Sequence, residues 1–335
     1  MSVRIVTQAE VPGLLPMREC VELMREALRS LARGDAVQPL RTVTPIPNGS
    51  GVLASMPAYL GAPRALGVKV ITVMPANQGT PLDSHQGAVL LFEAEHGSLV
   101  AVIDATSITA IRTAAVSAVA TDALARRDAA SAAILGSGVQ AASHLEAMCA
   151  VRPVGRARVW SRSLDHAAAF AKRESARLGI QIEAARSARE AVEGAEIICV
   201  ATAAKEPVLS GEWIAPGAHI NAVGACVPAH RELDTAAVQR SRLFVDRRES
   251  ALHEAGDILI PMREGAIGEE HVVGEIGELL LGRIEGRRGA DEVTLFKSLG
   301  LAIEDLAAAQ RIHANAVAKG DGVTVHLGGR RHDGA

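Results

Sequence analysis

The chain has 335 residues, a length that favours two domains and allows a large buried core. Its 35 basic and 38 acidic residues nearly balance, which argues against a nucleic-acid partner. The start lacks a secretory signal, the apolar runs are too short to span a membrane, and the four cysteines lack metal-ligand spacing. We therefore expect a cytoplasmic protein with no membrane segment and no metal site.

The first third of the chain predicts a helix followed by a mostly antiparallel sheet. Apolar residues recur at helical spacing over residues 17–32, and Gly34 is a typical helix stop. Residues 104–125 predict a second helix, rich in small side chains. Strand-like segments lie between the two helices, at residues 41–46, 51–56, 65–73, 87–93 and 99–104.

From residue 129 onward, predicted strands alternate with predicted helices, a pattern typical of a parallel sheet with right-handed crossovers. The predicted tail, residues 295–317, is one long helix that packs back on the first domain. The fold class is therefore α/β, with a doubly wound parallel Rossmann sheet and a discontinuous α+β domain. We expect the α+β domain to comprise residues 1–120 and 301–335, and the Rossmann domain residues 121–300. The alternating elements are the strands 131–135, 157–160, 197–201, 219–223 and 243–245, the helices 139–150 and 164–178, and short helices capped by Ser187 and Asp234.

A dinucleotide-binding fingerprint follows the strand at 131–135 and reads Gly136-Ser137-Gly138-Val139-Gln140-Ala141. Gly136 permits a tight turn, Gly138 lets the backbone approach a pyrophosphate, and Ala141 lets the helix pack close to the sheet. The N-terminus of that helix offers free N–H groups to the phosphates. A simple glycine-rich turn would not require all three residues in this register.

The end of the second strand predicts which nicotinamide cofactor binds. Enzymes that use NAD usually carry an acidic residue there, which holds the ribose 2′-hydroxyl. This chain instead has Ser161-Arg162-Ser163, an arginine flanked by two hydroxyls, which suits a 2′-phosphate. We therefore favour NADP(H), with NAD(H) possible; the alternative is that Arg162 is an ordinary solvated loop residue.

Three basic residues interrupt apolar patterns in the first domain: Arg41, Lys69 and Arg112. Buried charges need partners, because an isolated charge is costly in an apolar interior. The residues alone leave two interpretations open. The three side chains form ordinary ion pairs or extend to solvent, or they converge on an anionic ligand such as an amino-acid or imino-acid carboxylate.

Several further motifs point to one specific protein family. They are Gly67-Val68-Lys69, Asp83-Ser84-His85-Gln86-Gly87, Ile111-Arg112-Thr113-Ala114-Ala115, His219-Ile220-Asn221-Ala222-Val223-Gly224-Ala225, Arg231-Glu232-Leu233-Asp234 and Leu295-Phe296-Lys297-Ser298-Leu299-Gly300. Together with the fingerprint, and in this order, they resemble the ornithine cyclodeaminase/mu-crystallin family. The resemblance implies a homodimer in which the first domain binds substrate and forms the dimer, the second binds the cofactor, and the active site lies between them.

The resemblance also implies roles for individual residues. Arg41, Lys69 and Arg112 match the residues that gather the substrate carboxylate, and Lys69 and Arg112 are the expected catalytic residues. Glu254 matches an acid on the substrate side. The remaining matches are cofactor-binding: Ser84, His85, Arg112, Thr113, Gly136, Gly138, Val139, Gln140, Thr202, Val223 and Ser298.

The chain departs from true ornithine cyclodeaminases at two places. Cys226 stands where those enzymes carry a catalytic aspartate, and a thiol cannot replace a carboxylate as acid and base for the ornithine amine. A second acid, just before the Met-Pro pair, is absent from Ala54-Ser55-Met56-Pro57. Both departures argue against cyclodeamination.

The expected activity is NAD(P)H-dependent reduction of a cyclic α-imino acid, giving L-proline or L-pipecolate, by a branch of the family that resembles ketimine reductases and pyrroline-2-carboxylate reductases. The alternatives are ornithine cyclodeaminase, an alanine dehydrogenase-like enzyme, and a non-catalytic small-molecule binder. Among the other polar residues, we expect His144 and His166 on solvated helix faces and residues 283–288 in a solvated loop.

Overall fold

The computed structural model describes residues 2–77 and 79–328, and the chain divides into two compact units. Unit 1 comprises the described residues up to Arg112 and from Leu301 onward, and unit 2 is Thr113–Gly300. The first division falls after Arg112, inside helix α3 (Ala105–Leu124), where the sequence analysis expected it at residue 120. The expected first domain also included residues 1, 78 and 329–335, which lie outside the described residues.

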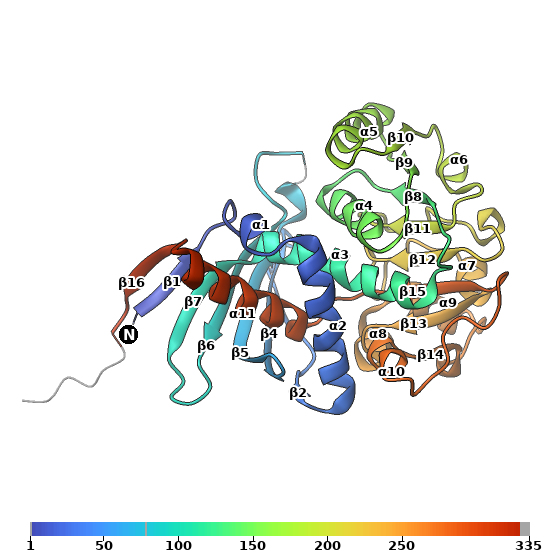
Figure 1. The fold of residues 1–335 in the computed structure, drawn as a ribbon. Coiled ribbons are helices and arrows are strands. Elements are labelled where there is room, and N and C mark those ends of the chain that lie inside the picture. The colour runs from blue at the N-terminus through green and yellow to red at the C-terminus, as the bar shows by residue number, and fades with distance from the viewer. Residues whose placement is uncertain (1, 78, 329–335) are drawn as a thin grey trace, which may run out of the picture. The chain divides into compact units, whose positions relative to one another are not determined.

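Unit 1 is built on a mostly antiparallel sheet, as predicted (Figure 1). Only the pairing of β1 with β7 is parallel among the described strands of this sheet. The strand order is β16 (Val323–His326), β1 (Ser2–Val6), β7 (Leu99–Asp104), β6 (His85–Phe92), β5 (Arg64–Val73), β4 (Val52–Gly61) and β2 (Ala36–Val37), with β3 (Thr42–Pro45) also paired to β4. The strands β16 and β1 at one edge and the two-residue β2 at the other were not predicted.

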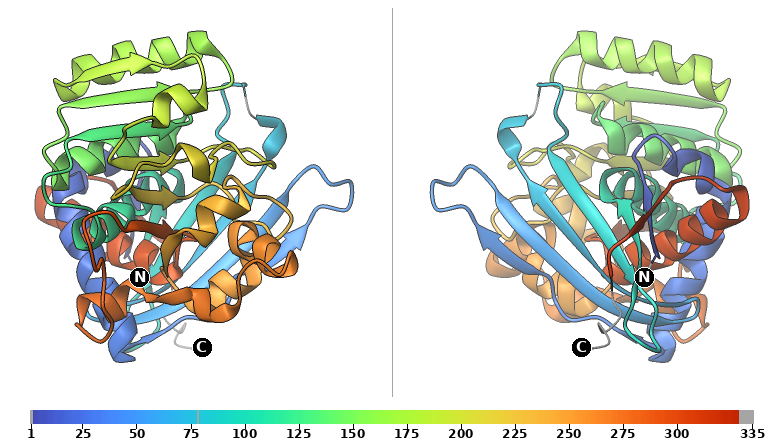
Figure 2. Two further views of the ribbon diagram at one scale, coloured as in Figure 1. Left: turned by 90° about the vertical axis from the view of Figure 1, so that its right-hand side faces the viewer. Right: turned by 90° about the vertical axis from the view of Figure 1, so that its left-hand side faces the viewer.

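Helices α2 (Met17–Arg33) and α11 (Ala302–Lys319) lie on the same side of this sheet in both views of Figure 2, and α1 (Val11–Leu14) precedes them. Strand residues alternate between the two faces of a sheet. Met56, Lys69, Val89 and Ile103 are therefore buried towards the helices. Their neighbours on the other face, such as Val68, are only partly buried.

Unit 2 is a doubly wound sheet in which every described strand pair is parallel. Helices α4 (Val139–Val151) and α5 (Leu164–Leu178) lie on one face, and α6 (Ala188–Val192) and α7 (Thr235–Gln239) on the other (Figure 1). The predicted fold class is confirmed. The strand order is β10 (Gln181–Ala184), β9 (Arg156–Trp160), β8 (Ser131–Leu135), β11 (Ile197–Val200), β12 (His219–Ala222), β15 (Val293–Lys297), β13 (Ser241–Val245) and β14 (Val272–Glu275), and the remaining helices are α8 (Arg248–Glu254), α9 (Gly256–Arg263) and α10 (Ile276–Leu280).

The prediction of one helix over residues 295–317 is wrong at its start. Val293–Lys297 is a strand between β12 and β13, and every one of its residues is buried. Such a strand has no polar face, so periodicity cannot distinguish it from a buried helix. Gly300 then takes a left-handed conformation (φ +79°), and α11 begins at Ala302.

Two expectations for polar residues are also wrong. His144 is completely buried: its Nε2 lies 3.0 Å from Ser117 Oγ and its Nδ1 lies 2.7 Å from the Gln140 carbonyl. Burial lowers the pKa of His144 to about 4, so the ring is neutral at physiological pH. The small residues of α3 allow this close approach of α4. His166 is exposed, as expected.

The segment 283–288 is not simply solvated, because Arg287 is half-buried. Its guanidinium donates hydrogen bonds to the Leu124 carbonyl at 2.6 Å and to Thr294 Oγ1 at 2.9 Å.

In the described part of the chain, no helix combines the length and the apolar character that crossing a bilayer requires.

Candidate active site

Lys69 and Arg112 meet two carboxylates in the interior of unit 1. Lys69 on β5 is 1% exposed and Arg112 on α3 is 4% exposed. Lys69 Nζ lies 3.1 Å from Asp305 Oδ1, and Arg112 Nε donates to that same oxygen at 2.8 Å. Arg112 Nη1 donates to Glu304 Oε2 at 2.7 Å. Lys69 and Arg112 therefore form ion pairs with these acids, and their binding of an anionic ligand stays a prediction.

The sequence analysis missed both acids. Glu304 and Asp305 lie in the first turn of α11, between small and apolar residues, and both are completely buried. A charged pair in an otherwise apolar helix face is the pattern that could have revealed them, because buried acids need cationic partners.

The Lys69 ammonium also donates to Thr109 Oγ1 at 2.6 Å, and that hydroxyl donates to the Ala105 carbonyl at 2.6 Å. Burial lowers the pKa of Lys69 to about 8, although the charge of Asp305 opposes the shift. The positive charge of Arg41, which immediately precedes β3 and is partly exposed, lowers the pKa further. Lys69 can therefore gain or lose a proton near neutral pH.

Ser84 and His85 lie where β6 begins, next to β5. The Ser84 carbonyl accepts a hydrogen bond from the Met74 amide at 2.8 Å, and the His85 carbonyl accepts one from Thr106 Oγ1 at 2.9 Å. Both backbones are thus held by hydrogen bonds. Their cofactor role stays a prediction.

Of the other predicted cofactor residues of unit 2, Thr113 lies on α3, and the rest lie at one edge of the sheet. Because all the strands are parallel, their carboxyl ends share that edge, which is where ligands bind in open α/β sheets. Most of these residues directly follow a strand end: Gly136 after β8, Ser161 after β9, Thr202 near the end of β11, Val223 after β12 and Ser298 after β15.

The fingerprint has the geometry that a dinucleotide requires. Gly136 has φ +117°, and an added Cβ would lie 2.4 Å from the Ala201 carbonyl oxygen, so only glycine fits there. At Gly138, the N-cap of α4, an added Cβ would meet nothing within 4 Å, and the next residue, Val139, is 60% exposed. The helix N-terminus is thus open to a pyrophosphate.

Ser298 offers a second polar group at the same edge of the sheet. Its side chain is buried at the carboxyl edge, and its Oγ has no hydrogen-bond partner among the residues that the structure describes. Buried hydroxyls almost always have a partner, so a polar ligand group would satisfy it.

The segment Ser161-Arg162-Ser163 follows β9, and its two hydroxyls are hydrogen-bonded to neighbouring residues. Ser137 Oγ donates to Ser161 Oγ at 3.1 Å, which ties this loop to the fingerprint. Ser163 Oγ accepts the His166 amide at 3.3 Å as the N-cap of α5, and its hydroxyl hydrogen can still be donated. The Arg162 side chain is exposed.

A buried carboxylate that the sequence analysis did not assign, Glu232, binds the loops that follow β11 and β12 at this edge. Glu232 Oε1 accepts hydrogen bonds from the amide and the hydroxyl of Thr202, each at 2.7 Å, and Oε2 accepts the Gly224 amide at 2.6 Å. Burial raises the pKa of Glu232 to about 7, against the opposing charge of Lys297. Lys297 itself pairs with Asp257 at 2.8 Å. These contacts fix the loops that carry Thr202 and Val223.

Cys226 lies three positions after Val223, whereas Glu254 lies at the end of α8. Cys226 Sγ donates to the Val223 carbonyl at 3.4 Å, and the side chain is partly exposed. Glu254 is the last residue of α8 and is partly buried. The thiol thus engages the backbone of the Val223 loop, which fits a small structural residue.

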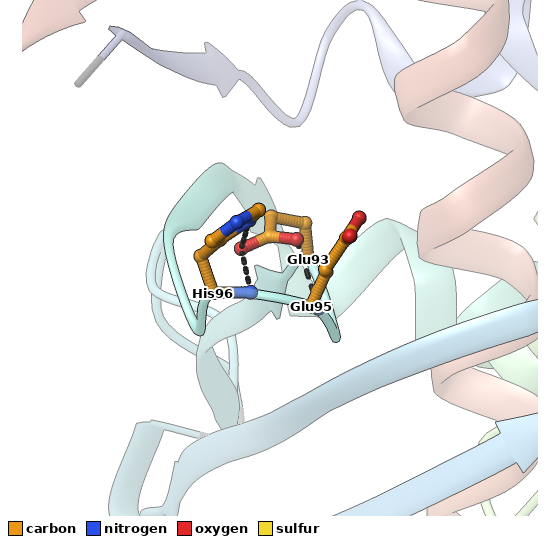
Figure 3. A group of neighbouring side chains, drawn as sticks. All are labelled: Glu93, Glu95 and His96. Carbon is orange, nitrogen blue, oxygen red and sulfur yellow. Dashed lines mark hydrogen bonds and ion pairs between the residues drawn. The ribbon is translucent and has the colours of Figure 1, made fainter.

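Figure 3 shows the one group of side chains in the described residues whose spacing could suit a metal ion: Glu93, Glu95 and His96. The Glu93 carboxylate accepts the amides of Glu95, His96 and Ser98, at 2.9, 2.7 and 3.1 Å. These three bonds stabilise the turn of the β6–β7 hairpin, a role that accounts for the carboxylate without a metal.

Known proteins resemble this chain over most of its length. The model of the ornithine cyclodeaminase/mu-crystallin family matches residues 1–320. The ketimine reductase mu-crystallin of Mus musculus is 43% identical over 280 residues, which is 84% of this chain and 85% of the mouse protein.

Two solved structures share the fold. The Δ1-pyrroline-2-carboxylate reductase of Thermococcus litoralis, in complex with NADH and L-proline, is 42% identical with a TM-score of 0.94, covering 96% of this chain and 100% of that one. An archaeal alanine dehydrogenase dimer with bound NAD is 33% identical with a TM-score of 0.92, covering 98% of this chain and 100% of that one.

Proposed function

Because the chain belongs to the ornithine cyclodeaminase/mu-crystallin family, we propose that it is an NAD(P)H-dependent reductase of cyclic α-imino acids, such as Δ1-pyrroline-2-carboxylate or Δ1-piperideine-2-carboxylate. The observation that carries this choice within the family is Cys226. A thiol bound to a backbone carbonyl stands where a cyclodeaminase needs a carboxylate.

We assign some of these residues to the substrate and the others to the cofactor. Arg41 and Arg112 bind the substrate carboxylate, Lys69 orients the imine, and Glu254 lines the substrate side. Gly136, Gly138, Val139 and Gln140 hold the pyrophosphate, while Thr202, Val223, Ser298, Thr113, Ser84 and His85 line the rest of the cofactor. When bound, the reduced nicotinamide supplies a hydride. Fixing two reactants in the correct geometry can contribute about 7–11 kcal/mol to lowering the barrier.

The direct test is cofactor oxidation at 340 nm with Δ1-pyrroline-2-carboxylate, run beside ammonia release from L-ornithine and beside pyruvate with ammonia. We expect imine-dependent oxidation to be the dominant activity. Ammonia release without net cofactor change would identify a cyclodeaminase, and pyruvate-dependent oxidation an alanine dehydrogenase. Tight cofactor binding without turnover on any substrate would point to a non-catalytic binder.

We propose that NADP(H) is the preferred cofactor, through Arg162 and its flanking hydroxyls. An Arg162→Leu variant should bind NADPH roughly 10- to 150-fold more weakly, because a hydrogen bond to a charged group contributes about 1.5–3 kcal/mol. Its affinity for NADH should hardly change, and both are measured by fluorescence titration. Equal changes for the two cofactors, or none for NADPH, would contradict the preference.

We also propose that the protein is a cytoplasmic homodimer that pairs through the open face of the unit 1 sheet. That face presents Val68, Val70, Leu90 and Val102, all partly exposed. A contiguous apolar surface of this kind commonly marks an interface, and the similar archaeal alanine dehydrogenase is described as a dimer. Sedimentation equilibrium showing a monomer at micromolar concentration would refute the dimer, and cell fractionation tests the location.

A further inference from the structure

We propose that Lys69 is the acid that protonates the imine nitrogen, and that Asp305 is the positioning residue that holds its ammonium group in place. This inference rests on the proposed function and assigns the source of the proton that the reduction consumes.

The hydrogen bonds of Lys69 leave one N–H bond for a ligand. An ammonium group has three N–H bonds. Within the described residues, two of them are used, by Thr109 Oγ1 at 2.6 Å and Asp305 Oδ1 at 3.1 Å. The side chain is 1% exposed, so water cannot freely satisfy the third. A buried donor without an acceptor is costly, and a substrate nitrogen would remove that cost.

Asp305 fixes the position of Lys69 relative to the arginine. A single oxygen, Oδ1, accepts from both Lys69 Nζ and Arg112 Nε, so the two cations are held at a set separation. Glu304 holds the opposite end of the guanidinium at 2.7 Å. A carboxylate bound by Arg112 and the adjacent imine nitrogen facing Lys69 is the geometry that an α-imino acid offers.

The charges around Lys69 allow it to act as an acid near neutral pH. Burial lowers the pKa of Lys69 to about 8, where an ordinary lysine would hold its proton much more tightly. General acids work best when their pKa lies near the working pH. The charged and titratable groups that face it come from every neighbouring element: Asp305 and Glu304 from α11, Arg112 from α3, Arg41 from the segment before β3, and His85 from β6.

Reduction of the imine consumes one hydride and one proton. The C=N π bond breaks as the imine carbon receives a hydride, two electrons from the reduced nicotinamide, and the nitrogen receives the Lys69 proton. New C–H and N–H bonds form, the imine is reduced to a secondary amine, and Lys69 becomes a neutral amine. Solvent then returns its proton.

A titration followed by NMR tests this without cofactor or turnover. The chain has only five lysines, so protein labelled with ¹³C at lysine Cε should give a resolvable signal for Lys69, assigned with Lys69→Arg. We expect its midpoint to lie near 8. In Asp305→Asn the midpoint should fall by about 1 pH unit or more, because a neighbouring opposite charge raises a lysine pKa by that amount. A Lys69 midpoint near 10.5 in the wild-type protein would overturn the proposal. So would a midpoint in Asp305→Asn that is no lower than that of the wild-type protein.

The pH profile of imine reduction gives the second readout. Only the protonated lysine can donate, so kcat/KM should fall as the pH rises through the Lys69 midpoint. Asp305→Asn should move that alkaline limb to lower pH by the same amount as its NMR midpoint. Protonation of the imine itself also makes kcat/KM depend on pH. The pH at which that change occurs is a property of the substrate, so it should be the same in the wild-type protein and in the variant. Lys69→Met should lose roughly a hundredfold or more in kcat, with a smaller change in KM.

The matched control is Glu19→Gln, which removes another carboxylate that pairs with α11, through Arg311, away from Lys69. It should leave the limb and the midpoint unchanged, and thermal melts establish that each variant is folded. If the alkaline fall in kcat/KM occurs at the same pH in Asp305→Asn as in the wild-type protein, the Lys69 inference is wrong, but the proposed function is unaffected. Wild-type protein that reduces no cyclic imine defeats the proposed function, and the Lys69 role falls with it.

Discussion

An Arg112→Met variant is expected to lose about 3–5 kcal/mol in free energy of unfolding, because removing one partner of a buried ion pair leaves the other charge uncompensated. Glu304 and Asp305 are both completely buried and both bind this guanidinium. Imine reduction should fall roughly a thousandfold in kcat/KM, since the substrate carboxylate loses a buried charged partner as well. Urea denaturation measures the first effect and steady-state kinetics the second.

The two effects can be separated with a double variant. Arg112→Met combined with Glu304→Gln should recover part of the stability, because one of the uncompensated charges is gone, but none of the activity. Arg311→Met is the control: it breaks the more exposed pair with Glu19, and such surface pairs contribute only about 0–1 kcal/mol. Near-wild-type activity in a folded Arg112→Met protein would show that Arg112 does not bind substrate.

The second large effect is expected at the two glycines of the fingerprint, and it should differ between them. Gly136→Ala should destabilise unit 2, because a side chain at φ +117° costs about 1–3 kcal/mol in backbone strain and its Cβ would lie 2.4 Å from the Ala201 oxygen. Cofactor binding should be lost with the turn.

Gly138→Ala should leave the free energy of unfolding within about 0.5 kcal/mol of wild type, because the added Cβ meets no protein atom within 4 Å. Affinity for the cofactor should nevertheless fall roughly tenfold or more, since the methyl group occupies the approach of the pyrophosphate. Thermal melts and cofactor titration of both variants make the comparison. Unchanged affinity in Gly138→Ala would show that the pyrophosphate does not approach this glycine.

Local patterns in the sequence determined the fold class and the cofactor motif. A turn such as Gly136–Gly138 depends on the conformation of a few consecutive residues, so its glycines and the strand before it can be recognised without any tertiary contact. The same holds for the caps at Ser187 and Asp234, whose side chains accept amides three residues later. The identity of Cys226, which argues against cyclodeamination, also needs no structure.

Only the tertiary structure decided what surrounds the predicted cations. Lys69 and Asp305 are 236 positions apart, and Arg112 and Glu304 are 192 apart, so no local pattern joins them. Val293–Lys297 became a central strand because β12 and β13 pair with its two edges, a fact that lies outside its own five residues. The sequence by itself thus determined which chemical groups the protein carries and how each turn is formed. Burial and pairing between distant segments decided the charge and protonation of those groups, because both depend on the loss of water and the partner that folding supplies.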